Sequence, residues 1–116
     1  MIAFKINTAE RKVEEIEINT WQDIAPAIGN ECTTFSAPVT FENEDTIYAD
    51  DEGLYHPFEG GFMMKDWSYP IVGNAILQGT DEEGESTEPL TTKEELEAMI
   101  IWVDKAKCER WAAQFN

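Results

Sequence analysis

The stretch PIVGNAIL at residues 70–77 is the strongest candidate for a buried strand in this chain. A short apolar run that is bounded by turn residues is typical of a strand covered on both faces. Gly73 lies in its middle, and a glycine inside a strand pattern indicates a bulge or the close approach of another backbone. The stretch therefore predicts one buried strand of a sheet, with an irregularity at Gly73.

Weaker β signals lie on the N-terminal side of this stretch. Short runs of β-branched and aromatic residues, separated by prolines, glycines and acidic turns, predict further strands. These runs cover residues 33–35, 39–41, 46–49 and 62–64. On the C-terminal side, residues 79–86 are rich in glycine and acids and predict a solvated turn.

The start of the chain predicts a hairpin followed by a short helix. Apolar residues alternate with polar ones over residues 2–6 and again over 13–18, on either side of a polar bend at 7–11. This alternation is typical of two antiparallel strands. Apolar residues then recur at helical spacing from residue 21 to 28, and Gly29 provides a stop.

Residues 91–115 are predicted to form one long C-terminal helix. Thr92 and Glu95 match a capping box, in which each residue bonds a backbone N–H near the other. Apolar residues at three- and four-residue spacing then form a stripe that would pack on the sheet, namely Leu96, Met99, Ile100, Val103 and Ala106.

A second apolar arc makes this predicted helix more hydrophobic than one packed face requires. One interpretation is that the helix lies in a groove of the sheet. The other is that the arc forms a second interface, for a partner or for another copy in a self-assembling accessory protein. The arc consists of Ile101, Cys108, Ala112 and Phe115.

Together these elements predict a single α+β domain over residues 1–116, with a mainly antiparallel sheet, a short helix after the first hairpin and a long C-terminal helix packed on the sheet. Cys32 and Cys108 match no metal or redox spacing, so we expect free thiols rather than a disulfide. No apolar run reaches the roughly 18–20 residues that span a bilayer, and we recognise no secretory signal. We therefore expect a cytoplasmic protein.

The chain carries a large negative charge. Its 24 Asp and Glu against 8 Lys and Arg give −16 at pH 7, whereas small domains usually carry a charge of about 2–8 in magnitude. This charge excludes direct binding to nucleic-acid phosphates or to anionic membrane surfaces. The four Trp, six Phe and three Tyr residues indicate a folded core rather than disorder.

Most of the acidic residues fall in two runs. Residues 42–59 contain seven acids and no Lys or Arg, and residues 81–97 contain eight acids with Lys93 alone. If the acidic turns at 50–53 and 81–84 lie at one end of the sheet, their field would attract a basic protein surface. The alternative is an acidic surface that serves solubility or suits a saline habitat. The predicted partner-binding residues are Glu42, Glu44, Asp45, Asp50, Asp51, Glu52, Glu59, Asp81, Glu82, Glu83 and Glu85.

Few residues suit catalysis. His56 is the only histidine, and no common nucleophile, phosphate-binding or zinc motif occurs. A pair of His56 with Cys32 or Cys108 lacks any local nucleophile signature, and the acidic turns lack the alternating ligands of an EF-hand loop. We therefore predict a non-enzymatic binding protein with no cofactor and no metal. The alternative is a small-ligand or divalent-metal-binding module near Tyr48, Tyr55 and His56.

The chain resembles a family of small uncharacterised proteins from phages, prophages and plasmids that carry a DUF-type domain. The resemblance lies in two segments, residues 47–54 (IYADDEGL) and 70–85 (PIVGNAILQGTDEEGE). The resemblance implies a mobile-element accessory protein in a bacterial cytoplasm. By analogy it implies inhibition of a host protein that handles nucleic acid, such as restriction, CRISPR or repair machinery. Separately, the acidic runs would mimic DNA if their carboxylates formed a row with the spacing of its charges. The resemblance carries over no catalytic residues.

Overall fold

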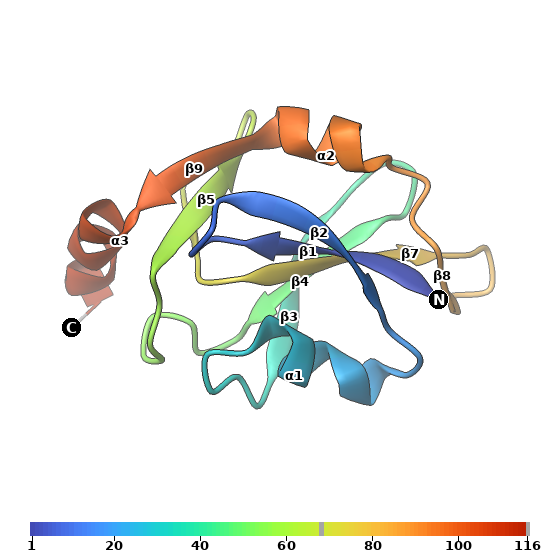
Figure 1. Ribbon diagram of the computed structural model, residues 1–116, viewed down its shortest axis with the longest axis horizontal. Coiled ribbons are helices and arrows are strands. Elements are labelled where there is room, and N and C mark those ends of the chain that lie inside the picture. The colour runs from blue at the N-terminus through green and yellow to red at the C-terminus, as the bar shows by residue number, and fades with distance from the viewer. Residues whose placement is uncertain (68, 116) are drawn as a thin grey trace.

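The computed structural model describes residues 1–67 and 69–115, which form two antiparallel sheets with short helices (Figure 1). Within these residues, six strands make the large sheet, in the order β2-β1-β7-β4-β3 with β8 paired to β7, and three make the small sheet, in the order β6-β5-β9. The strands of the large sheet are β1 (Ile2–Asn7), β2 (Lys12–Glu17), β3 (Phe35–Thr40), β4 (Thr46–Asp50), β7 (Ala75–Thr80) and β8 (Ser86–Thr87). Those of the small sheet are β5 (Gly60–Met64), β6 (Ile71–Val72) and β9 (Ile100–Asp104).

The helices are short. The first hairpin, β1 with β2, is followed by the 3-10 turn η1 (Trp21–Asp23) and α1 (Ile24–Ile28), which confirms the helix predicted over residues 21–28. The others are α2 (Lys93–Met99), α3 (Lys105–Ala112) and the 3-10 turn η2 (Ala113–Phe115). None of the helices in the described residues has the length and apolar character needed to cross a bilayer.

The segment at residues 70–77 is buried as predicted, but it is not one strand. Gly73 has a φ of +83°, a value that favours glycine, and at this point the chain leaves β6 of the small sheet and enters β7 of the large one. The buried side chain of Asn74 fixes the crossing. Its Oδ1 accepts hydrogen bonds from the backbone N–H and the hydroxyl of Thr8, and its Nδ2 donates to the carbonyl of Ile28.

Hydrophobic clusters on both faces of each sheet hold the layers together. Between the sheets pack Phe4, Ile47, Phe62, Leu77 and Leu96, among others. On the outer face of the large sheet, Ile76 packs against Ile24 and Ile28 of α1, whereas on the outer face of the small sheet Val103 packs against Cys108 of α3. β7 is therefore covered on both faces, which explains the apolar run Ala75, Ile76 and Leu77 in its first half.

The prediction of one long helix over residues 91–115 is wrong. Residues 100–104 form β9, which pairs with β5 from Gly60↔Asp104 to Met64↔Ile100. Along β9, Ile100 and Trp102 face the core between the sheets and Val103 faces α3, so the run is an alternating strand of β-branched and aromatic residues. Its spacing also fits a helical stripe, which is why the helix was predicted.

Two capped helices flank β9. The predicted capping box of α2 is confirmed, because Thr92 Oγ1 accepts from the Glu95 N–H at 3.1 Å and the Glu95 carboxylate accepts from the Thr92 N–H at 2.9 Å. A second helix start was missed: the Asp104 carboxylate accepts from the Lys107 N–H at 2.8 Å and caps α3. The fold is thus α+β and antiparallel as expected, with α2, β9 and α3 in place of one helix.

Candidate functional site

The predicted partner-binding acids lie at opposite ends of the large sheet. β4 and β7 are antiparallel neighbours, with Thr46 opposite Gln78 and Ala49 opposite Ala75. The loop after β4 therefore lies at the start of β7, and the turn after β7 lies at the start of β4. Figure 1 shows the β7–β8 turn at the right and the loop between β4 and β5 at the lower left. The two acidic turns do not meet, so the single acidic face that the sequence suggested does not form.

We name the two groups by their position. The turn end carries the acids of the β3–β4 and β7–β8 turns, which are Glu42, Glu44, Asp45, Asp81, Glu82, Glu83 and Glu85. The loop end carries Asp50, the last residue of β4, and the acids of the loop between β4 and β5, which are Asp51, Glu52 and Glu59.

A groove of about 560 Å³ runs between the two turns at the turn end. Four of its acidic side chains belong to the turns or flank them, and Glu88 adds a fifth that the site prediction omitted. Leu90 lies among them with 70% of its surface exposed. The residues that line the groove are Asn43, Glu44, Thr80, Asp81, Glu82, Glu83, Thr87, Glu88 and Leu90, which include no Lys or Arg.

Two of the predicted partner-binding acids hydrogen-bond backbone groups of the fold. Asp45 is 1% exposed, and its carboxylate accepts hydrogen bonds from the N–H groups of Leu90 at 3.1 Å and Thr91 at 2.7 Å. It joins the β3–β4 turn to the segment before α2 and cannot contact a partner, which corrects the prediction. Asp81 accepts from the N–H groups of Glu83 and Glu85, both at 2.9 Å, and shapes the β7–β8 turn.

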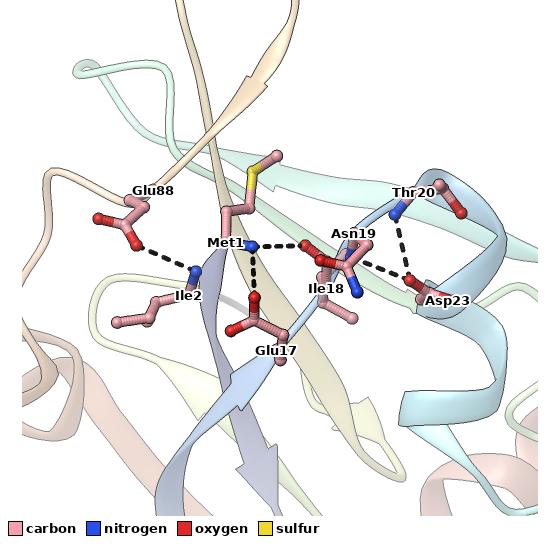
Figure 2. Close-up of polar contacts among 8 residues, drawn as sticks. All are labelled: Met1, Ile2, Glu17, Ile18, Asn19, Thr20, Asp23 and Glu88. Atoms are coloured by element: carbon pink, nitrogen blue, oxygen red, sulfur yellow. Dashed lines mark hydrogen bonds and ion pairs between the residues drawn. The ribbon is translucent and has the colours of Figure 1, made fainter.

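Other carboxylates near the chain start also accept from backbone groups (Figure 2). The Met1 amino group donates to Glu17 at 2.9 Å and to the Ile18 carbonyl at 3.1 Å, while Glu88 accepts from the Ile2 N–H at 3.1 Å. Asp23 accepts from the N–H groups of Asn19 and Thr20, and these hydrogen bonds lower the pKa of its carboxyl. Glu88 thus both lines the groove and accepts a hydrogen bond from the first residue of β1.

The remaining turn-end acids keep their charge uncompensated. Among the described residues, the ion pairs join Met1 to Glu17, Lys12 to Glu10 and Glu14, and His56 to Asp50. The exposed carboxylates of the β3–β4 and β7–β8 turns take part in none of them. Because they share one end of the sheet around a groove without cations, they create a concentrated negative field.

The loop end holds an ion pair between its only histidine and a buried carboxylate. The Asp50 side chain, 4% exposed, lies 2.6 Å from Nδ1 of His56 and also accepts from the Glu52 N–H at 2.9 Å. The hydrogen bond to Asp50 raises the pKa of His56. Cys32 lies near the same carboxylate, and burial, with Asp50 in addition, raises the pKa of its thiol to about 11. A neutral thiol is a poor nucleophile, so these three residues argue against a Cys–His pair.

The predicted second interface does not form one surface. Ile101 lies in β9 and is 53% exposed, whereas Cys108 and Ala112 lie on the buried side of α3 and are 0% and 8% exposed. The side chain of Phe115 lies outside the described residues. The arc required a continuous helix, and β9 interrupts it. In the described part of the chain, no three His, Cys, Asp or Glu residues gather as a metal site.

An aromatic-lined pocket at the loop end was not predicted from the sequence. Tyr69, just before β6, and Trp111, in α3, lie at its wall with their rings stacked. They are far apart in sequence and come together only because β9 places α3 beside the small sheet. No local motif could have paired them.

Comparisons of the chain with protein-family models, with curated protein sequences and with solved structures gave no significant match. They assign no family, and the resemblance to phage and plasmid proteins stays a prediction from the sequence.

Proposed function

We propose that this chain is a non-enzymatic acidic protein that binds a basic surface of another protein through its turn end. The observation that carries the proposal is the groove between the β3–β4 and β7–β8 turns, lined by five carboxylate side chains and no cation. Opposite charge across an interface speeds association and selects the partner.

The groove also offers more than charge. Leu90 exposes an apolar side chain among the carboxylates, and burial of such a side chain contributes affinity that salt does not screen. A surface that normally holds nucleic acid has the required mixture of Lys, Arg and apolar groups, because phosphate contacts are made by cations. We infer such a surface as the partner.

The biological setting belongs to the proposal through the sequence resemblance. We propose that the chain acts in a bacterial cell as a product of a phage or mobile element and inhibits a host protein by covering its basic surface. Asp45 is left out of the binding site because it is buried.

The experiment compares two variants of equal charge. One replaces Glu82, Glu83 and Glu85 by Gln, and the other replaces Asp51, Glu52 and Glu59 by the corresponding amides. Each removes three exposed carboxylates, at opposite ends of the sheet. Immobilised protein is used to capture partners from bacterial lysate at low and high salt, and the captured protein is then purified for affinity measurements.

We expect the turn-end variant to lose at least about tenfold in affinity and the loop-end variant to change little. High salt should weaken the parent complex, because exposed charges are screened within about 10 Å at 0.1 M salt. Equal losses in both variants would show that bulk charge rather than the turn end drives binding, and salt-insensitive capture would contradict the electrostatic mechanism.

A further inference from the structure

A second concave site, separate from the acidic groove, opens at the loop end. It is a pocket of about 200 Å³ between β3, the loop after β4, β6 and α3. Pockets for drug-sized ligands usually measure about 300–1,000 Å³, so this one suits a smaller group, of the size of one side chain. Its floor is apolar and buried, with Ala49, Ile71 and Val72 below 9% exposed.

Aromatic rings form the wall of the pocket. Tyr69 and Trp111 stack with their ring centroids 5.9 Å apart and their planes within 4°, and Trp67 holds the other contact of Tyr69 at 5.3 Å. Tyr69 and Tyr55 are nevertheless 42% and 68% exposed. The exposed parts of the Tyr69 and Tyr55 rings can attract a cation through the ring quadrupole, and this attraction grows when the cation is desolvated.

Carboxylates form the rim. Asp51 and Glu52 line the pocket and are exposed, while Asp50 lies deeper with its charge directed to His56. The lining residues include no Lys or Arg. Such a rim repels anions, whereas a compact cation would find negative charge at the mouth and aromatic rings in the wall. The two features are independent of each other, and they select the same chemistry.

We propose that this pocket binds a compact organic cation of the guanidinium or alkylammonium class. The cation is either a free small molecule or the side chain of an Arg or Lys presented by a peptide. The pocket lies at the end of the sheet away from the groove, so this inference does not rest on the proposed function.

The test is an NMR titration of the isotope-labelled full chain at 150 mM KCl. The probes are methylguanidinium and tetramethylammonium, and their neutral counterparts are methylurea and tert-butanol. We expect the cations to shift the indole N–H of Trp111 and the backbone amides of residues 51–55, and to bind at least about fivefold more tightly than the neutral compounds. This expectation follows because one cation–ring contact of about 0.5–2 kcal/mol corresponds to a factor of about 2–30 in affinity. Equal affinity for the neutral compounds overturns the proposal.

A peptide arm separates the two sources of the cation. Acetyl-Gly-Arg-Gly-amide carries the same guanidinium group within a peptide backbone. Tighter binding of the peptide than of methylguanidinium assigns the pocket to a protein side chain, and equal or weaker binding assigns it to a free cation. Both results require the same shifts at Trp111.

Variants locate the site. Tyr69→Leu removes the exposed ring and should weaken cation binding at least about threefold. Because loss of stacking can disturb folding, the double variant Asp51→Asn, Glu52→Gln provides a second test that leaves the packing intact.

The matched control is Glu82→Gln, Glu83→Gln, which removes the same charge at the turn end and should leave cation binding unchanged. Equal weakening by the control pair, or shifts spread over the turn end, would mean non-specific attraction and would overturn the proposal. The control pair should still weaken partner capture, so failure of this inference and failure of the proposed function are distinguishable.

Discussion

Asp45 shows at the scale of one residue how burial changes the meaning of an acidic side chain. Its neighbours Glu42 and Glu44 are exposed, whereas Asp45 accepts two backbone hydrogen bonds in a buried position. In the sequence the three residues look alike, because they lie in the same acidic run and carry the same charge. What separates them is a contact with Leu90 and Thr91, 45 and 46 residues further along the chain.

We expect Asp45→Ala to destabilise the protein by roughly 2–4 kcal/mol, because the N–H groups of Leu90 and Thr91 lose their acceptor. Urea denaturation measures the free energy of unfolding. Glu44→Gln, an exposed neighbour with a similar loss of charge, is the control and should stay within about 0.5 kcal/mol of the parent. Similar stability for both variants would contradict a structural role for Asp45.

His56 gives the folded protein a pH dependence near neutrality. The hydrogen bond to Asp50 raises its pKa above the ordinary histidine value of 6.5, with Glu52 and Glu31 adding in the same direction. The folded state therefore holds the proton more tightly than the unfolded state. The resulting stabilisation is fully present below about pH 6.5 and is lost as the pH rises through the folded-state pKa.

We expect the free energy of unfolding of the parent to fall between pH 6 and pH 9 and that of His56→Gln to fall less. Urea titrations at several pH values measure both, and the His56 ring proton resonances report its pKa directly. Asp23 and Glu14, whose pKa values are lowered, affect stability only at acidic pH, so they do not interfere. An identical pH profile in the variant would show that the ion pair is not responsible.

Residues 100–104 show at the scale of elements why the C-terminal prediction failed while the N-terminal one succeeded. In the hairpin of β1 and β2, partner strands are neighbours in sequence, so local alternation and a short bend were sufficient. In β9, an apolar run of about five residues fits both helical and strand spacing. The choice depends on β5, some 40 residues earlier in the chain, which supplies the hydrogen-bonding edge.

The same limit applies to the candidate site. The sequence shows which turns are rich in acids, but it could not place the turns at 50–53 and 81–84 relative to each other. Their separation follows from the antiparallel pairing of β4 with β7, in which Ala49 lies opposite Ala75. Long-range pairing of this kind leaves no local signature, whereas the capping box at Thr92 and the stop at Gly29 are local and were predicted.

Asp104→Ala distinguishes the observed elements from one long helix. Because Asp104 caps α3 through the Lys107 N–H, we expect the variant to lose about 1 kcal/mol of stability. In a continuous helix over residues 91–115 the same change would place the best helix former at an interior position and would raise both helix content and stability. Circular dichroism and urea denaturation separate these outcomes. Asp104→Ser, which retains a capping oxygen, should recover most of the loss.

At the scale of the whole molecule, the charge of −16 opposes folding. Few of the acids are compensated by ion pairs in the described residues, and half of the uncompensated ones lie at the two ends of the large sheet. Self-repulsion of this kind destabilises the compact state and is screened by salt. If removal of these acids stabilises the protein, then the acids are retained although they reduce the stability of the fold. A binding role explains this better than solubility does.

The two triple variants have the same formal charge of −13, since −16 plus 3 is −13. One changes Glu82, Glu83 and Glu85 to Gln at the turn end, and the other changes Asp51, Glu52 and Glu59 to the corresponding amides at the loop end. We expect each to be more stable than the parent by about 0.5–1 kcal/mol in 20 mM KCl, because each relieves repulsion within its own cluster, and the gain should shrink as KCl is raised to 300 mM. Thermal unfolding over this series measures the effect, and KCl is used because sulfate would also strengthen hydrophobic burial. A turn-end variant that gains stability while it loses its partner would show that these carboxylates are retained for binding against their cost to folding. A variant that is no more stable than the parent at low salt would show that the repulsion is already relieved, and solubility would then account for the acids equally well.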